Sequence, residues 1–180
     1  MNATELRISA QTISGIQLNE VTSFNWVKDA IREIVTKYYK AGKKVTDTFS
    51  NASEGQKYYF TKELVMLTGV KDAAGSGVSP NYGYSVDSDN SIEFKDNGSY
   101  QVAYYSMPSM PSTSTEQLPI PAAYQDCIPF FLASKIRARL FGQTDSDAVS
   151  FYQQFREAMD EANSAINRQA SRGRRMPPRR

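Results

Sequence analysis

The most constraining feature of the sequence is an apolar seam near its C-terminal end. Apolar side chains alternate at intervals of four and three residues: Ala148, Tyr152, Phe155, Met159, Ala162 and Ile166. This spacing puts them on one face of a helix of about three heptads, and that face must be covered by another helix. A second apolar stripe lies over residues 120–141, a short loop away. Two helices joined in this way are expected to form an antiparallel pair.

Several residues mark where these two helices begin and end. Pro129 lacks a backbone N–H, so it must kink or restart the helix over 120–141, and Gly142 should end it. Thr144 and Asp147 have the spacing of a capping box at the start of the last helix. The spacing predicts that this helix continues to about Gln169.

Two further helices are predicted near the N-terminus. Residues 4–18 suggest a short helix interrupted by Gly15. Residues 22–40 form a clearer one, with Thr22 or Ser23 as its N-cap and Gly42 after its end. Its apolar stripe consists of Phe24, Val27, Ile31, Ile34, Val35 and Tyr38.

The pattern changes to that of strands over residues 44–106. Residues 45–49 alternate between apolar and polar, and residues 58–67 are rich in aromatic and branched side chains. Two more alternating runs, 92–95 and 100–105, flank Asn97-Gly98. This dipeptide is typical of a tight hairpin turn, because both residues tolerate positive φ.

The predicted fold is therefore mainly α (α+β): a four-helix-type bundle with an inserted small β-hairpin region and an extended C-terminal arm. Its expected parts are N-terminal helices over 1–43, the β-region with its loop over 44–107, a linker over 108–119, a helix pair over 120–169 and the arm over 170–180.

The composition argues against an enzyme. The chain has no histidine, which excludes Ser-His-Asp and Cys-His nucleophiles, imidazole metal sites and histidine bases. Its single cysteine, Cys127, rules out an internal disulfide and is expected to be a buried, inert thiol. The sequence indicates no catalytic residue, metal site or cofactor.

Two acidic clusters have simple structural interpretations. Asp87, Asp89 and Ser91 have alternate spacing that suggests a calcium loop, but the positions that need glycine and glutamate hold Ile92 and Gly98, so a polar β-turn is favoured. Asp145 and Asp147 could form a carboxylate pair. At a helix start, however, they are expected to stabilise the helix dipole.

Two segments are candidates for contact with partners. The Gly-rich stretch over 69–83 lacks a phosphate-binding motif and is expected to form an exposed loop. This loop is a candidate for contact with a neighbouring subunit or a tail protein, through Asp72, Ser76, Val78, Pro80, Asn81 and Tyr82. Lys135, Arg137 and Arg139 form either a basic patch or a solvated helical face.

The excess positive charge lies at the C-terminal end. The chain has 21 Lys and Arg against 19 Asp and Glu, and six of the arginines fall within residues 168–180. Without that segment the remaining chain has 15 basic and 19 acidic residues, a net charge of −4. The arm is expected to dock on a partner through Arg172, Arg174, Arg175, Met176, Pro177, Pro178, Arg179 and Arg180.

Three interpretations of the arm remain open. In the first, its arginines bind the phosphates of a nucleic acid. In the second, the arginines bind carboxylates of a partner protein bidentately, while Met-Pro-Pro lies extended in a groove of that partner. In the third, the arm is simply disordered. Membrane binding is disfavoured because no amphipathic apolar face accompanies the charge. No apolar run is long enough to span a bilayer, and the first residues lack a signal-peptide pattern, so synthesis in the cytoplasm is expected.

The helical segments resemble a known family. Phe24-Asn25-Trp26-Val27-Lys28-Asp29-Ala30-Ile31-Arg32-Glu33-Ile34 resembles a helix that recurs in the head–tail connector (adaptor, or head-completion) proteins of tailed bacteriophages. Leu118-Pro119-Ile120-Pro121, followed by the helix of residues 128–136, is similar to a second family helix. A final helix with Tyr152, Phe155 and Met159 follows, and the β-insert ending at residues 104–108 also fits.

The resemblance implies a structural virion protein and no enzymatic activity. Its copies would form a ring, typically of twelve, that joins the portal protein to a tail or second connector (stopper or nozzle) protein. Viral DNA would pass through the central channel, with direct contact possible, and assembly would take place in the host cytoplasm. By position, Arg172–Arg180 would dock on the portal. The alternative is a small DNA-binding protein anchored by the arginine-rich arm.

Overall fold

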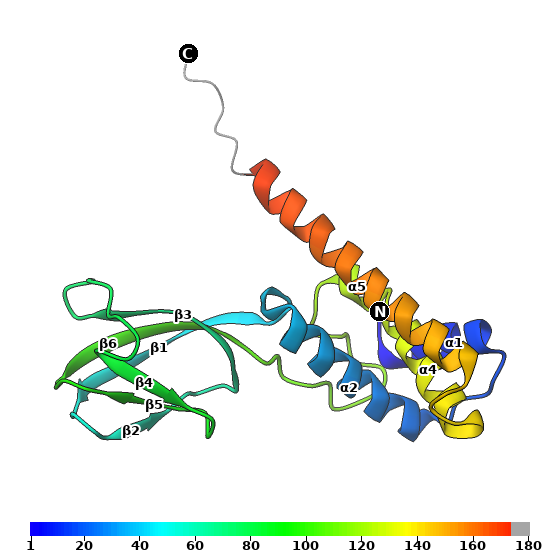
Figure 1. Cartoon of the computed structure of the whole chain (residues 1–180), viewed down its shortest axis with the longest axis horizontal. Helices are drawn as coiled ribbons and strands as arrows, with labels where there is room; N and C mark the ends of the chain where they lie inside the picture. Colours follow the sequence, from blue (N-terminus) through cyan, green and yellow to red (C-terminus); the bar gives the residue numbers. More distant parts are fainter. Residues whose placement is uncertain (174–180) are drawn as a thin grey trace, which may run out of the picture. The chain divides into compact units, whose positions relative to one another are not determined.

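The computed structural model describes residues 1–173, with side chains as far as Gln169. The chain divides into two compact units. One comprises Met1–Ile34 and the chain from Ser109 onward, and the other comprises Val35–Pro108. Figure 1 shows that the first is built from helices and the second from strands, so they are called the helical unit and the β-unit.

The helical unit contains α1 (Ala3–Ser14), most of α2 (Glu20–Lys37), the short α3 (Ala122–Gln125), α4 (Ile128–Phe141) and α5 (Ser146–Gly173). Gly15 ends α1 in the left-handed conformation, with φ 68°, and Gly142 ends α4 with φ 100°. Pro129 lies in the first turn of α4 and restarts the helix there. These predicted boundaries are confirmed.

The two predicted N-caps are wrong by a few residues. The helix α2 begins at Glu20, and the Asn19 side chain accepts a hydrogen bond from the Thr22 N–H at 3.2 Å. At the start of α5, Asp145 rather than Thr144 accepts from the Ala148 N–H, at 3.0 Å. Asparagine and aspartate are strong N-caps, and each stands at the position where its oxygen reaches the first free amides.

The apolar seam of α5 packs on α4, and the two helices form the predicted antiparallel pair (Figure 1). Four of its residues are buried: Ala148, Phe155, Met159 and Ala162. The rings of Phe131 and Phe155 lie 5.0 Å apart between centroids. The seam is therefore the core of the helical unit, as the spacing predicts.

The β-unit contains two antiparallel sheets of three strands each. One has the order β1-β6-β3 and the other β2-β5-β4. Their bounds are β1 (Lys43–Ala52), β2 (Lys57–Tyr59), β3 (Leu64–Asp72), β4 (Tyr84–Asp87), β5 (Ser91–Phe94) and β6 (Gly98–Ser106), preceded by a short 3₁₀ helix, η1 (Tyr39–Ala41). Val102 of β6 pairs with Asp47 of β1 on one side and Val70 of β3 on the other.

An aromatic core joins the two sheets. It contains buried residues of both: Ala52, Phe60, Val70, Tyr84, Ile92, Phe94, Tyr100, Val102 and Tyr104. The ring of Phe94, from one sheet, stacks on that of Tyr100, from the other, with centroids 4.0 Å apart. The β-unit is thus a small sandwich with a core of its own.

The predicted fold class is therefore wrong. The protein is an α+β fold in which a six-strand sandwich is a second compact unit, and it is not a helical bundle carrying a small hairpin. The strands β2 and β4 have only three and four residues, too few to show a clear period of two. The alternating pattern therefore understated the number of strands.

The predicted hairpin at Asn97-Gly98 is also wrong. The strands β5 and β6, which flank it, do not pair with each other and belong to different sheets. Neither Asn97 nor Gly98 has positive φ, which a two-residue hairpin turn requires. The Asn97 side chain instead accepts a hydrogen bond from the Glu54 N–H at 2.8 Å. This turn carries the chain from one sheet to the other.

Two polar side chains divide the predicted strand over 58–67. Asp47, almost fully buried, accepts hydrogen bonds from the Thr61 N–H, the Thr61 hydroxyl and the Tyr104 hydroxyl at 2.7–2.9 Å. Asn90 accepts from the Leu64 N–H at 2.7 Å. These bonds hold the turn that separates β2 from β3.

Within the described part of the chain, no helix has the length and apolar character needed to cross a bilayer.

Candidate docking surface at the α4–α5 turn

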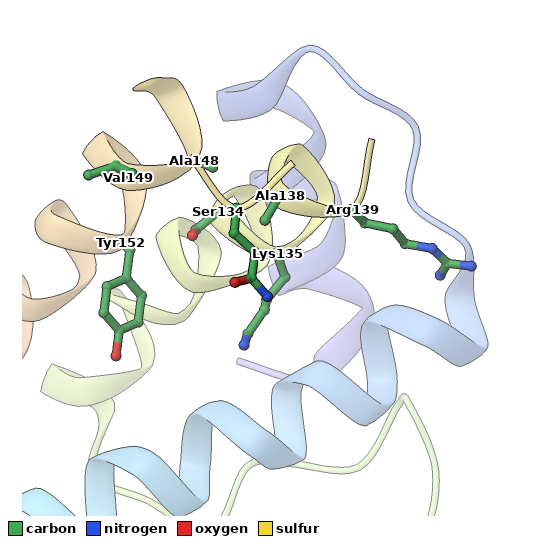
Figure 2. A pocket seen from close by; sticks show the side chains of 8 residues that line it. Ser134, Lys135, Ala138, Arg139, Ala148, Val149 and Tyr152 are labelled. Carbon is green, nitrogen blue, oxygen red and sulfur yellow. The ribbon is translucent and has the colours of Figure 1, made fainter. Parts of the chain in front are cut away.

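A groove lies where the C-terminal half of α4 meets the first turns of α5. Its volume is about 510 Å³. The lining residues are Ser134, Lys135, Ala138, Arg139, Gln143, Ala148, Val149 and Tyr152. All of them except Gln143, which lies in the turn, come from α4 and α5, and Figure 2 shows Lys135 and Tyr152 pointing to one side and Arg139 extending in a different direction. The groove thus combines small and apolar side chains with two cations.

The turn beside this groove exposes large apolar side chains. Leu140 is 55% exposed, Phe141 59% and Val149 53%. Leu140 falls within the predicted apolar stripe over residues 120–141, yet its side chain is exposed. A cluster of exposed apolar residues next to cations is typical of a protein-contact surface.

An ion-pair cluster holds this surface in place. The Arg137 Nε and one Nη lie 3.1 and 3.2 Å from the two carboxylate oxygens of Asp145, and that Nη is 2.6 Å from Asp147. The guanidinium carbon of Arg137 also lies 4.4 Å from the ring centroid of Phe141. Arg137 therefore ties the start of α5 to the end of α4 and fixes the exposed Phe141 ring.

The pKa of Asp145 reports on this cluster. It lies below its usual value, because Arg137 and then the Ala148 N–H donate hydrogen bonds to the carboxylate. A carboxyl whose pKa is lowered by folding contributes stability above its unfolded pKa of about 3.9. That contribution is lost as the pH falls through the lower pKa of the folded state.

We expect Arg137→Ala to lower the melting temperature at pH 7. The difference in melting temperature between wild type and variant should shrink as the pH falls below about 4, because the wild type also loses the stabilising contribution of Asp145 there. Thermal unfolding of both proteins between pH 3 and 7 measures the difference. Arg139→Ala is the matched control, because Arg139 lies on the same helix and forms no ion pair among the described residues. A deficit of equal size at every pH would contradict the assignment.

The three residues predicted as a basic patch or a solvated helical face, Lys135, Arg137 and Arg139, do not share one environment. Arg137 is neutralised by Asp145 and Asp147, whereas Lys135 and Arg139 line the groove. The predicted role of Asp145 at the helix start is confirmed. The predicted polar turn at Asp87, Asp89 and Ser91 is also confirmed, and Lys57 pairs with both aspartates at 2.6 and 3.2 Å.

The predicted contact loop over Asp72–Tyr84 joins β3 to β4 and is organised by its own hydrogen bonds. Asp72 accepts from the Ser76 N–H at 2.8 Å, and the Val78 N–H donates to Val70 at 2.9 Å. Asn81 has positive φ, and Tyr82 is 86% exposed. Pro80 forms an isolated bridge with Tyr84. The loop presents Tyr82 on the β-unit and lies in a different unit from the groove.

The predicted docking arm falls almost entirely beyond the structure. Residues 174–180, which include Arg174, Arg175, Met176, Pro177, Pro178, Arg179 and Arg180, lie outside the described residues. Arg172 belongs to α5, which continues to Gly173, so the helix extends past its predicted end at Gln169.

Cys127 is buried, as predicted, and burial raises the pKa of its thiol to about 12.

Sequence reasoning missed the surface at the α4–α5 turn. Phe141 and Val149 were not singled out, and Leu140 was placed only within the apolar stripe over residues 120–141. A signal was available, because Leu140-Phe141 directly precedes the helix-ending Gly142, where a helix has few covering neighbours. The chemistry of this surface suits non-covalent docking, since its polar groups are two cations, two hydroxyls and one side-chain amide beside apolar carbon.

Comparison of the chain with protein families and with characterised proteins gives no match.

Proposed function

We propose that the protein is a structural subunit of a bacteriophage virion, a head-to-tail connector (adaptor) whose copies form a ring between the portal and the tail. One observation carries the proposal: the segments that resemble the connector family belong to one unit. Residues 24–34 lie in α2, residues 128–136 in α4 and Tyr152 to Met159 in α5. The first and second of these are more than 90 residues apart in the sequence.

The groove and the exposed apolar turn add physical support. A ring subunit needs surfaces for its neighbours and for the components above and below it, and such surfaces are apolar with a polar rim. The helical unit has Leu140, Phe141 and Val149 exposed beside Lys135 and Arg139. The exposed Tyr82 of the β-unit is the candidate contact with a tail or second connector protein.

In this proposal the arginine-rich end docks on the portal. We expect that deleting residues 174–180 leaves the helical content unchanged but abolishes binding to the portal protein encoded in the same genome, since the four arginines of this segment can form several charge-assisted bonds at once. The measurement is the mass of the full chain and of the truncated chain, alone and mixed with that portal, at low and moderate salt. A truncated chain that still joins the portal would contradict the role of the arm.

A lysine variant separates this proposal from its alternative, a small DNA-binding protein anchored by the arm. Replacing Arg174, Arg175, Arg179 and Arg180 by lysine keeps the charge but removes bidentate bonding to carboxylates. Portal docking should then weaken, whereas binding to duplex DNA, which depends on charge, should persist and fall steeply with salt. A full chain that ignores the portal but binds DNA in this way would favour the alternative.

A further inference from the structure

A second groove lies on the helical unit, between α3, the start of α4 and the C-terminal half of α5. Its volume is about 570 Å³. Its lining includes small and apolar residues: Ala123, Cys127, Phe130, Ala158, Ala162 and Ala165. Its charged lining residues are Asp126, Glu161 and Arg168. It is called the acid-rimmed groove.

Within the described part of the chain, the two acids of the groove have no ion-pair partner, although Arg168 lines the same groove. Neither Asp126 nor Glu161 forms an ion pair with another described residue, whereas the Arg168 Nε donates to the Ser164 carbonyl within its own helix at 3.3 Å. The alanine side chains are small, and the groove of about 570 Å³ has room for large side chains beside the acids. An occupant that matches this groove presents one or two large apolar side chains next to a cation.

Such a group exists on the same chain, at the end of α4. Leu140 and Phe141 are more than half exposed, and they directly follow Arg139. Phe141 is held by Arg137, which is itself fixed by Asp145 and Asp147, so the ring loses little freedom on binding. These three residues, Arg139, Leu140 and Phe141, are called the α4 knob.

The knob cannot fill the groove of its own chain. Phe130 in the groove and Phe141 in the knob are eleven positions apart on one continuous helix, which separates them by about 16 Å along its axis. A contact between knob and groove must therefore join two copies. If the two surfaces meet head to tail, each copy keeps one surface free for the next copy, and contacts of this kind build rings when the rotation between copies closes.

We propose that the α4 knob of one copy inserts into the acid-rimmed groove of the next, with Leu140 and Phe141 over the alanines and Arg139 facing Asp126 and Glu161. This inference deepens the proposed function and rests on it for the ring geometry. It names a second copy of this chain as the occupant because the apolar and charged parts of the two surfaces are complementary.

Cross-linking of single-cysteine chains tests the contact. In the Cys127→Ala background, full-length Leu140→Cys and Ala165→Cys chains are mixed and treated with a short bismaleimide. We expect heterodimers to form faster than homodimers of either chain. Ile8→Cys replaces Leu140→Cys as the matched control, because Ile8 is 54% exposed on α1 of the same unit. Equal rates for Ile8→Cys and Leu140→Cys would overturn the proposal.

A chain that carries both Leu140→Cys and Ala165→Cys tests the head-to-tail arrangement. It should give a ladder of trimers and larger products, and products that stop at dimers would overturn this arrangement. A charge exchange provides a second measurement: Arg139→Glu and Glu161→Arg should each weaken self-association at least about tenfold, and the double variant should restore it. A double variant no better than the single ones would overturn the pairing.

These results are separable from the portal experiment. If the wild-type chain joins the portal in several copies but Leu140→Cys and Ala165→Cys do not cross-link preferentially, the interface is wrong and the connector function stands. If they cross-link and form the ladder but no portal binding occurs, the interface stands and the connector function fails.

Discussion

Phe94→Ala is expected to reduce the free energy of unfolding of the β-unit by about 3–5 kcal/mol. Phe94 is fully buried and stacks on Tyr100 of the opposite sheet. Its ring also lies 5.7 Å from that of Phe49 and 5.9 Å from that of Tyr58. Removing it leaves a cavity between the sheets and breaks its ring contacts with Tyr100 and Phe49 of the opposite sheet.

Hydrogen exchange measures this effect within the β-unit. Backbone amides of the central strands β5 and β6 should exchange roughly a hundredfold faster or more, since each 1.4 kcal/mol of local stability corresponds to about a factor of ten. Tyr82→Ala is the matched control, because it removes an aromatic ring of the same unit that is 86% exposed. Unchanged protection in Phe94→Ala would show that the two sheets do not depend on a shared core.

Phe155→Ala is expected to destabilise the helical unit by a similar amount, about 3–5 kcal/mol. Phe155 is fully buried between α4 and α5, and its ring lies 5.0 Å from that of Phe131 and 5.9 Å from that of Tyr152. It is the central large residue of the α5 seam. Its loss should separate the helices that carry the docking surface.

The single tryptophan allows the helical unit to be followed alone. Trp26 lies on α2 within that unit, so its fluorescence during urea unfolding reports on the unit directly. The unfolding midpoint of Phe155→Ala should fall well below that of the wild type. Phe141→Ala, which removes an exposed phenylalanine of the same helix pair, should shift it by much less. Equal shifts for both variants would contradict the assigned core.

The comparison also bears on the proposed interface. If Phe141→Ala leaves the fold stable while weakening self-association, its effect arises at the contact between copies. A residue that is exposed, rigidly held and unimportant for folding is a candidate binding residue. Phe155 and Phe141 thus provide a pair of the same residue type with opposite expected roles.

Some features of the fold could be predicted from the sequence because they depend on neighbours along the chain. Gly15 and Gly142 end helices through their own conformational freedom, and Pro129 restarts one through its missing N–H. The α5 seam depends only on helical periodicity, so its burial on α4 was readable from spacing. The burial of Cys127 was predicted from its position next to Ile128 on a predicted helix and from the absence of a histidine to activate it, and it is confirmed.

Features that depend on distant segments could not be predicted. Asn97-Gly98 has the local preference for a hairpin, but the core that joins Phe94 to Tyr100 requires β5 and β6 to lie in opposite sheets. The turn between β2 and β3 is fixed by Asp47 and Asn90, which are 14 and 26 residues from the groups they bind. The packing of these segments outweighed the local turn preference.

The candidate surface illustrates the same division. Sequence periodicity determined that Leu140 lies on the apolar side of α4, and composition determined that a histidine-dependent site is excluded. Only the tertiary structure decided that Leu140 and Phe141 are exposed. It also decided that Arg137 pairs with Asp145 and Asp147, whereas Arg139 has no ion-pair partner among the described residues. The physical reason is that exposure and ion pairing depend on where the neighbouring helices end, whereas helical periodicity is a property of the local chain.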